Sequence, residues 1–214
     1  MAKSLLKILI ADDHNVVRKG IMKSLASRFS EITFGEASNG ADVLRKVHEE
    51  KWDLVILDIS MPGRSGLEVL AEIKELQPKL PVIIFSMYPE DQFAVRCLKA
   101  GASAYLSKEV SSEELESAIT KILNGDRFIS PTVTSLLIDE LQNKNKKSAH
   151  ESLSDREYQV LILISQGKSV SDIGRELNLS VKTVSVYRSN ILTKMNLKNN
   201  SEMMYYAFKN NLVY

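Results

Sequence analysis

Short apolar runs rich in β-branched residues alternate with amphipathic stretches through the first half of the chain. The runs stand at residues 7–11, 32–36, 54–57, 82–85 and 104–106, and each has the length of a β-strand. The stretches between them repeat apolar residues at helical spacing, as in Val16, Ile21, Leu25 and Phe29 and again in Leu67, Leu70, Ile73 and Leu76. Such alternation predicts an α/β fold with a five-stranded parallel sheet covered by helices on both faces.

Beyond residue 150 the pattern becomes purely helical. It predicts four helices, over about residues 154–167, 169–177, 180–195 and 201–209. Ser154 and Glu157 have the spacing of a capping box, and Gly167 is placed to end the first of these helices. The tract 142–152 reads QNKNKKSAHES and lacks apolar periodicity, which is typical of a linker, and Pro131 opens a helix before it with Ser130 as N-cap. We therefore expect a domain over 1–125, a linker helix and tether over 126–150, and a second domain over 151–214.

The composition is that of a folded protein, with 44% hydrophobic and 26% charged residues. The longest apolar runs fall far short of the roughly 18 residues of a membrane span. The opening MAKSLLKILIADD places acidic residues where a secretory signal would stay apolar, so we expect a cytoplasmic location and no membrane partner. The single cysteine, Cys97, cannot form an internal disulfide and is expected to be a buried filler, with a redox role as the alternative.

Charge is unevenly distributed along the chain. Residues 1–125 carry 16 Lys and Arg against 18 Asp and Glu, whereas residues 181–214 carry five basic residues against one acidic residue. A local basic excess is compatible with nucleic-acid binding, but a solvated helix face is equally compatible with it.

Polar residues follow four of the predicted strands. Asp12 and Asp13 end the first, Asp58 the third and Ser86 the fourth, and Lys108 follows the fifth. The carboxyl ends of parallel strands share one edge, where ligands bind in open α/β sheets. Converging carboxylates repel one another unless a cation neutralises them, so a hard ion with oxygen ligands is expected, and Mg²⁺ fits best.

The same residues suit phosphoryl transfer, in which positioning and charge neutralisation dominate. Asp58 would be the nucleophile, and Lys108 and Ser86 would bind the phosphoryl oxygens. Each acidic residue taken alone could equally be a helix cap. Caps do not explain a lysine after the fifth strand together with a hydroxyl after the fourth.

The motifs ADDH at 11–14, LVILDISMPGRSG at 54–66, Ser86 and AYLSK at 104–108 resemble the receiver domain of bacterial two-component response regulators. The resemblance covers about residues 5–125 and implies a flavodoxin-like sheet with strand order 2-1-3-4-5. It implies that Asp58 accepts phosphate, that Asp13 binds Mg²⁺ directly, and that Asp12 does so largely through water. It further implies a metal contact from the backbone carbonyl of Ser60 and an inward movement of Tyr105 as an aromatic switch.

Two positions depart from the usual receiver pattern. Receivers often have a proline after the switch lysine, whereas this chain has Glu109. A cis bond without proline costs about 3–4 kcal/mol, so no cis peptide is assumed there. Serine in place of threonine at position 86 keeps the hydroxyl and loses a methyl group.

The second and third helices of the last domain have the arrangement of a helix-turn-helix, with a third helix that is basic and rich in hydroxyls. Arg188 could bind a guanine, Asn190 an adenine and Val186 a thymine methyl group. Lys182, Thr183 and Lys194 are better suited to the DNA backbone. The full candidate set is Lys182, Thr183, Ser185, Val186, Arg188, Ser189, Asn190 and Lys194.

The segment from Leu153 to Asn199, which begins LSDREYQVL, resembles the four-helix DNA-binding domain of the LuxR/FixJ/NarL class over about residues 151–212. The resemblance implies a recognition helix over 181–195 and dimerisation through the last helix. Apolar residues of that helix serve the core or a dimer contact, and we favour the core for most of them.

Together the two resemblances predict a transcriptional regulator rather than an enzyme, apart from its own phosphorylation and slow dephosphorylation. The expected partners are a sensor histidine kinase, promoter DNA and a second copy of the chain after phosphorylation, with RNA polymerase as a further candidate. The alternatives are a phosphatase with an aspartyl intermediate, which would usually have an acid where Ser60 stands, and a protein-docking module that does not bind DNA. The kinase, the stimulus, the operator and the sign of regulation do not follow from the sequence.

Overall fold

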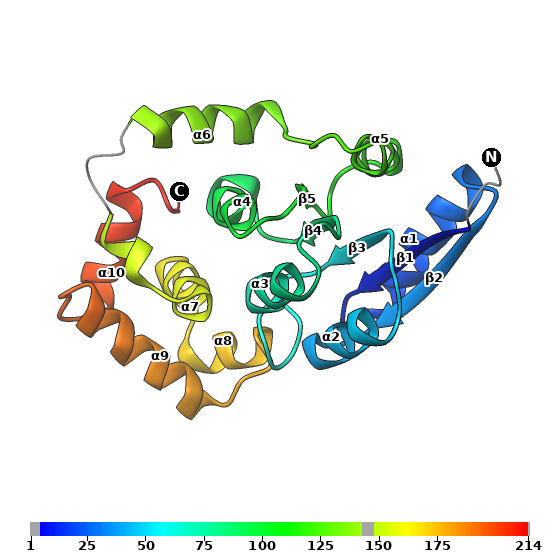
Figure 1. Cartoon of the computed structure of the whole chain (residues 1–214). Helices are drawn as coiled ribbons and strands as arrows, with labels where there is room; N and C mark the ends of the chain where they lie inside the picture. The colour runs from blue at the N-terminus through cyan, green and yellow to red at the C-terminus, as the bar shows by residue number, and fades with distance from the viewer. Residues whose placement is uncertain (1–4, 143–147, 214) are drawn as a thin grey trace. The chain divides into compact units, whose positions relative to one another are not determined.

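The chain forms two compact units, Met1–Leu136 and Leu137–Tyr214. The structure, a computed structural model, describes residues 5–142 and 148–213 and is drawn in Figure 1. The domain limits at 1–125, 126–150 and 151–214 stay predictions, and residues 143–147 of the predicted tether lie outside the described residues.

The first unit contains a five-stranded parallel sheet in the order β2-β1-β3-β4-β5 (Figure 1). The order agrees with the one that the resemblance implied, and each strand begins and ends within one residue of its predicted range. Apolar residues occupy every position of β3 and are all buried, as expected for a strand covered on both faces. The strands are β1 (Leu6–Ala11), β2 (Ile32–Ala37), β3 (Leu54–Leu57), β4 (Val82–Ser86) and β5 (Ala104–Ser107).

Helices cover both faces of this sheet. Ile8, Ile56 and Ile83 pack with residues of α1 and α5 in one core cluster on the first face. The neighbouring strand positions Leu9 and Val55 are also buried, on the face that α2, α3 and α4 cover (Figure 1). The five helices are α1 (Asn15–Arg28), α2 (Gly40–Glu49), α3 (Gly66–Leu76), α4 (Glu90–Lys99) and α5 (Ser112–Leu123).

Two residues of the predicted apolar helix faces, Val16 and Leu76, are exposed rather than buried. Val16 is 84% exposed, because its five-residue spacing to Ile21 places it about 140° around the helix from the buried stripe. Leu76, the last residue of α3, is 49% exposed.

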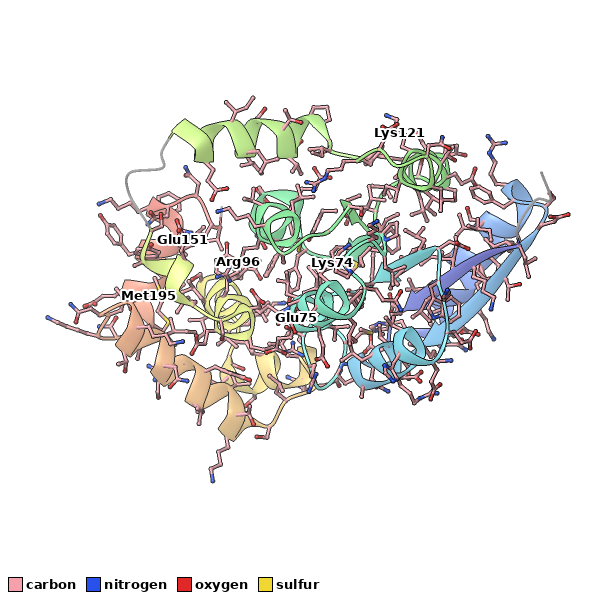
Figure 2. The ribbon with its side chains drawn as sticks, viewed as in Figure 1. Lys74, Glu75, Arg96, Lys121, Glu151 and Met195 are labelled. Carbon is pink, nitrogen blue, oxygen red and sulfur yellow. The ribbon has the colours of Figure 1, made fainter. Side chains whose placement is uncertain are left out.

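The predicted linker helix is α6 (Pro131–Gln142). Ser130 caps it as predicted, because its Oγ accepts a hydrogen bond of 3.2 Å from the Val133 amide. The same hydroxyl donates to Glu90 Oε2 at 2.5 Å and so attaches the start of α6 to the first residue of α4. Before α6, Lys121 on α5 (labelled in Figure 2) lies with its ammonium 5.4 Å from the centre of the Phe128 ring.

The second unit is helical. Helix α7 packs against α9 and α10, and α8 packs against α9. The capping box of Ser154 and Glu157 is present, and Ser180 caps α9. Asn178, which has a positive φ of 53°, makes the turn between α8 and α9, and this arrangement confirms the predicted helix-turn-helix. The elements are η1 (Ala149–Ser152), α7 (Asp155–Ser165), α8 (Val170–Glu176), α9 (Val181–Lys194) and α10 (Asn200–Lys209).

Among the described residues, no helix combines the length and the apolar character needed to cross a membrane. The same part of the chain contains no cis peptide bond, so the bond between Lys108 and Glu109 is trans, in keeping with the absence of proline.

Candidate functional sites

A lysine and two aspartates meet at the carboxyl edge of the sheet. Lys108 Nζ lies 2.6 Å from Asp12 Oδ2 and 3.1 Å from Asp58 Oδ2. All three side chains are at most 8% exposed. The strands account for this convergence, because Asp12 and Asp58 directly follow the neighbouring strands β1 and β3, and the Asp58 amide donates to the Ala11 carbonyl at 2.9 Å.

The charges in this pocket do not balance. Burial raises the pKa of Asp58, and the nearby negative charge of Asp12 raises it further, while Lys108 and the Ser60 amide lower it. Burial lowers the pKa of Lys108, but the two carboxylates outweigh it and leave that pKa raised. Asp58 Oδ1 is buried and accepts no hydrogen bond. One ammonium thus faces two buried carboxylates, and an uncompensated buried oxygen remains.

Asp13 and His14 extend the pocket toward solvent. One potential ligand atom from each of Asp12, Asp13 and His14 lies within 4.8 Å of the others. The carboxylate oxygens of Asp12 and Asp13 are ligands that a hard divalent cation such as Mg²⁺ prefers, and the orphaned Asp58 Oδ1 lies at the same edge of the sheet. Ser60 is half-buried in the loop after β3. Its carbonyl as a ligand stays a prediction.

Ser86 and Tyr105 are connected through the segment that follows β4. Ser86 Oγ accepts a 3.1 Å hydrogen bond from the Tyr88 amide, and Tyr105 donates its hydroxyl to the Tyr88 carbonyl at 2.7 Å. Tyr105 is 2% exposed, and burial raises its pKa well above the usual value. The ring that the resemblance describes as moving inward therefore already lies inside in this structure.

The turn after Asp58 depends on a close backbone approach. A Cβ atom on Gly66 would lie 2.3 Å from the Asp58 carbonyl oxygen and 2.6 Å from Ile59 Cα. The Gly66 amide donates to the Ile59 carbonyl at 3.0 Å, which holds the two backbone segments together. Gly66, the last residue of the LVILDISMPGRSG motif, thus fixes the backbone that carries Asp58.

Arg18 is a further residue of this region that the sequence did not single out. Its Nε donates to Glu36 Oε2 at 2.8 Å, its Nη1 donates to the Asp12 carbonyl at 2.8 Å, and its side chain is 13% exposed. The guanidinium thus connects α1, the end of β1 and β2. Its position one helical turn after His14 was the available signal, but the partner Glu36 on β2 could be found only from the fold.

Helix α9 presents a polar face. Lys182, Ser185, Val186 and Ser189 are exposed at helical spacing, whereas Val184 and Ile191 are buried on the opposite side. The hydroxyls of Ser185 and Ser189 donate to carbonyls one turn back, at 2.9 and 3.1 Å. Asn190 is exposed as well.

Three further candidate DNA contacts, beside Ser185 and Ser189, also have partners inside the second unit. Thr183 is half-buried and its amide is bonded to Ser180 Oγ at 3.0 Å. Arg188, also half-buried, donates from Nε to Asn200 Oδ1 at 2.6 Å. Lys194 Nζ lies 2.7 Å from Glu157 Oε2, although it keeps 43% of its side chain exposed.

A parallel five-stranded sheet with an aspartate–lysine pocket at its carboxyl edge, followed by a helix-turn-helix, defines a receiver joined to a helical DNA-binding module. Comparison with known proteins agrees with this class. The model of the response regulator receiver domain matches residues 8–120, and that of the bacterial regulatory proteins of the luxR family matches residues 151–207. The chain therefore belongs to the LuxR-type response regulators, the NarL/FixJ group.

Relatives match over nearly the whole chain. Response regulator GacA of Pseudomonas aeruginosa is 35% identical over 98% of each chain, and oxygen regulatory protein NreC of Staphylococcus carnosus is 35% identical over 97% of this chain and 99% of its own. Among solved structures, RcsB of Salmonella enterica serovar Typhimurium, bound to promoter P1flhDC in the presence of phosphomimetic BeF3−, is 26% identical with a TM-score of 0.60. That alignment covers 95% of this chain and 98% of RcsB.

Proposed function

We propose that this chain is a transcription factor whose binding to promoter DNA is controlled by phosphorylation of Asp58. The observation that carries the proposal is the buried contact of Lys108 with both Asp12 and Asp58. The family relation and the DNA-bound RcsB structure support the output as DNA binding.

The phosphoryl step follows from the pocket. A phosphohistidine of a sensor kinase would supply the group, so that a P–O bond forms to a carboxylate oxygen of Asp58 while the P–N bond to the imidazole breaks. The leaving nitrogen takes up a proton and returns to neutral imidazole. Lys108 is then free to pair with the phosphoryl oxygens, and Ser86, buried at the end of β4, offers its hydroxyl to them.

Asp12, Asp13, Asp58 and the Ser60 carbonyl would hold Mg²⁺. When bound, Mg²⁺ would supply positive charge against the carboxylates and the incoming phosphoryl oxygens. Without it, the raised pKa of Asp58 shows that the ionised carboxylate is disfavoured by burial. The chain's own residues provide the nucleophile, the ammonium and the hydroxyl that position the group.

Phosphorylation would shift an equilibrium between two states rather than create a new fold. Because the Tyr105 ring is already buried, the conformational change on phosphorylation would involve Ser86 and the backbone of Tyr88 more than the tyrosine ring. The result would be a homodimer that places two copies of α9 on promoter half-sites. Lys182, Ser185, Val186, Ser189 and Asn190 supply the exposed contact face, and RNA polymerase is a further candidate partner.

DNA selection from a pool of genomic fragments tests this proposal. The full chain is incubated with and without acetyl phosphate and Mg²⁺, beside Asp58→Ala and the matched control Asp126→Ala, which removes an exposed carboxylate from the same unit. We expect phosphodonor to tighten binding of the unchanged chain and of the control, and not of Asp58→Ala. Binding that ignores phosphodonor and Asp58 would overturn the phosphorylation control, and no binding at all would favour a protein-docking module.

The DNA face is tested separately through salt dependence. Lys182→Ala should weaken binding across sequences and reduce the slope of log K against log salt by about 0.9, the value for one lost phosphate contact. Lys209→Ala on α10 removes the same charge outside α9 and serves as the control. An equal effect of both variants would indicate that α9 does not contact the DNA backbone.

A further inference from the structure

The residue that caps α6 is also bonded to the first residue of α4. The Ser130 hydroxyl donates to Glu90 Oε2 at 2.5 Å, a distance typical of a hydroxyl bonded to an ionised carboxylate. The same hydroxyl accepts the Val133 amide at 3.2 Å, which satisfies the start of α6 without Glu90. Ser130 and Glu90 are 40 positions apart in the chain, and both belong to the first unit. Capping of α6 therefore does not explain the bond to Glu90.

The chain just before Glu90 leads to the phosphorylation pocket. Ser86 is the last residue of β4, and its Oγ accepts the Tyr88 amide at 3.1 Å. The Tyr88 carbonyl accepts the Tyr105 hydroxyl at 2.7 Å. Pro89 alone separates Tyr88 from Glu90. Because the proline ring fixes φ, little of a displacement of Tyr88 can be absorbed before it reaches Glu90.

The start of α4 is weakly fixed by its own sequence. Its N-cap is Pro89, whose side chain makes no capping hydrogen bond. By contrast, the side chains of Asn39, Ser65 and Ser111 cap α2, α3 and α5. Met87, in the connection between β4 and α4, is 66% exposed and is not held by packing. The first turn of α4 can therefore shift at less cost than the first turn of a capped helix.

The segment before α6 has a second anchor that does not depend on α4. The Phe128 amide donates to the Ser103 carbonyl at 3.3 Å, just before β5, and the Phe128 ring packs against the core cluster of the sheet. Loss of the bond to Glu90 leaves the chain held at Phe128 and lets the first turn of α6 move about residues 129–130. Val133, which is 2% exposed, limits the extent of that movement.

We propose that the bond between Glu90 and Ser130 is a latch that holds the start of α6 on α4 until Asp58 is phosphorylated. The proposal rests on the proposed function, because it uses the movement of Ser86 toward the phosphoryl group. That movement takes Ser86 Oγ away from the Tyr88 amide and shifts the start of α4. The Glu90 carboxylate moves with α4 and leaves Ser130. The helix that leads to the second unit thus responds to chemistry at the edge of the sheet.

Hydrogen exchange of the full chain tests the latch, with mass spectrometry of peptides that cover residues 128–136 as the readout. Each protein is measured with and without acetyl phosphate and Mg²⁺, and its intact mass reports phosphorylation. Glu90→Ala removes the acceptor, and Glu90→Gln keeps a neutral acceptor oxygen at the same position. Glu114→Ala is the matched control, because it removes an exposed acid from the first turn of α5.

We expect phosphorylation to speed exchange of residues 128–136 about tenfold, as for the loss of one charge-assisted hydrogen bond. Glu90→Ala should exchange at the fast rate without phosphodonor and gain nothing from it. Glu90→Gln should be intermediate, because a neutral acceptor makes a weaker bond. Glu114→Ala should behave as the parent does.

A further pair of variants separates the latch from a general effect of the Glu90 charge on α4. In a protein that already carries Ser130→Ala, the change Glu90→Ala should not speed exchange of residues 128–136 any further. An equal effect of Glu90→Ala in the presence and absence of the Ser130 hydroxyl would overturn the proposal. Phosphodonor that speeds exchange as much in Glu90→Ala as in the parent would do the same.

The intact mass distinguishes failure of the latch from failure of the proposed function. A chain that gains phosphate while exchange of residues 128–136 stays unchanged refutes the latch alone. A chain that gains no phosphate on Asp58 refutes the proposed function, and the latch, which opens on phosphorylation, fails with it.

Discussion

Replacing Gly66 by alanine should damage both the stability and the chemistry of the first unit. The new Cβ would stand 2.3 Å from the Asp58 carbonyl oxygen, 2.6 Å from Ile59 Cα and 3.0 Å from the Asp58 carbonyl carbon. Ordinary carbon contacts lie at about 3.5–4.0 Å, so the backbone must separate by about 1 Å. Every atom that is struck belongs to the main chain, and no side chain can rotate away. Overpacking of this kind costs about 1–3 kcal/mol.

The same displacement moves the nucleophile. A shift of about 1 Å in a reacting group costs on the order of 100-fold in rate, so the Gly66→Ala variant should be phosphorylated by acetyl phosphate about 100 times more slowly. Unfolding by urea, followed by the fluorescence of the sole tryptophan, Trp52, gives the change in stability. Intact-mass measurement over time gives the rate of phosphorylation.

Gly20→Ala is the matched control for this prediction. Gly20 lies within α1, and an added Cβ would meet nothing within 4 Å. Glycine inside a helix costs about 0.5–1 kcal/mol relative to alanine, so this variant should be more stable by that amount and be phosphorylated at the normal rate. The two substitutions should therefore change the free energy of unfolding in opposite directions. A Gly66→Ala protein that is as stable and as reactive as the parent would refute the argument from backbone contact.

Three further variants test other contacts. Arg18→Gln should weaken Mg²⁺ binding about tenfold, with partial recovery in Arg18→Lys, because the guanidinium orients the acidic end of β1. Calorimetry measures the Mg²⁺ affinity, and an unchanged affinity in Arg18→Gln would contradict this role. For Glu157, burial would raise the pKa, but hydrogen bonds from Lys194 and Ser154 outweigh it and leave it lowered. The stability that Glu157 contributes should be present above the ordinary pKa of 4.5 and lost as the pH falls through the lowered pKa of the folded protein. The urea midpoints of Glu157→Gln and the parent should therefore differ at neutral pH and converge in acid. Ser130→Ala removes the cap of α6, worth about 1 kcal/mol, and should speed amide exchange in its first turn several-fold, whereas Thr132→Ala should not.

The strands could be predicted because their signal is local. Consecutive β-branched residues such as those of β3 are buried on both faces, and few other environments accept such a run. The buried faces of the helices were harder to predict, because apolar residues at only approximately helical spacing need not lie on one face. Val16, which is exposed, is the example. The capping residues Ser154 and Ser180 were predictable because a cap uses only neighbours three residues away.

The residues of the pocket could be predicted from the topology of the sheet. Once the strands are parallel, Asp12, Asp58 and Lys108 must approach one edge, and their chemistry follows from residue type. The partners of Arg188 and Lys194 could not be predicted from the sequence, because Asn200 and Glu157 come near only when α9 packs against its neighbours. Both basic residues were therefore predicted to contact DNA, although Arg188 is bonded to a neutral partner and Lys194 to an acidic one.

Those partners bear on how the two sites could work. Lys108 is held between two carboxylates, and Lys194 between solvent and one buried carboxylate. A group that binds phosphate must first give up such a contact, so its net gain is the difference between the new and the old interaction. In the pocket, a divalent cation held by the carboxylates would replace the positive charge that Lys108 withdraws when it turns to a phosphoryl group. At Lys194 the partner is Glu157, a carboxylate that is 3% exposed, so releasing the lysine to DNA would take a counter-charge away from a buried group. Lys182, which is exposed on α9, is therefore a better candidate than Lys194 for a contact with the DNA backbone.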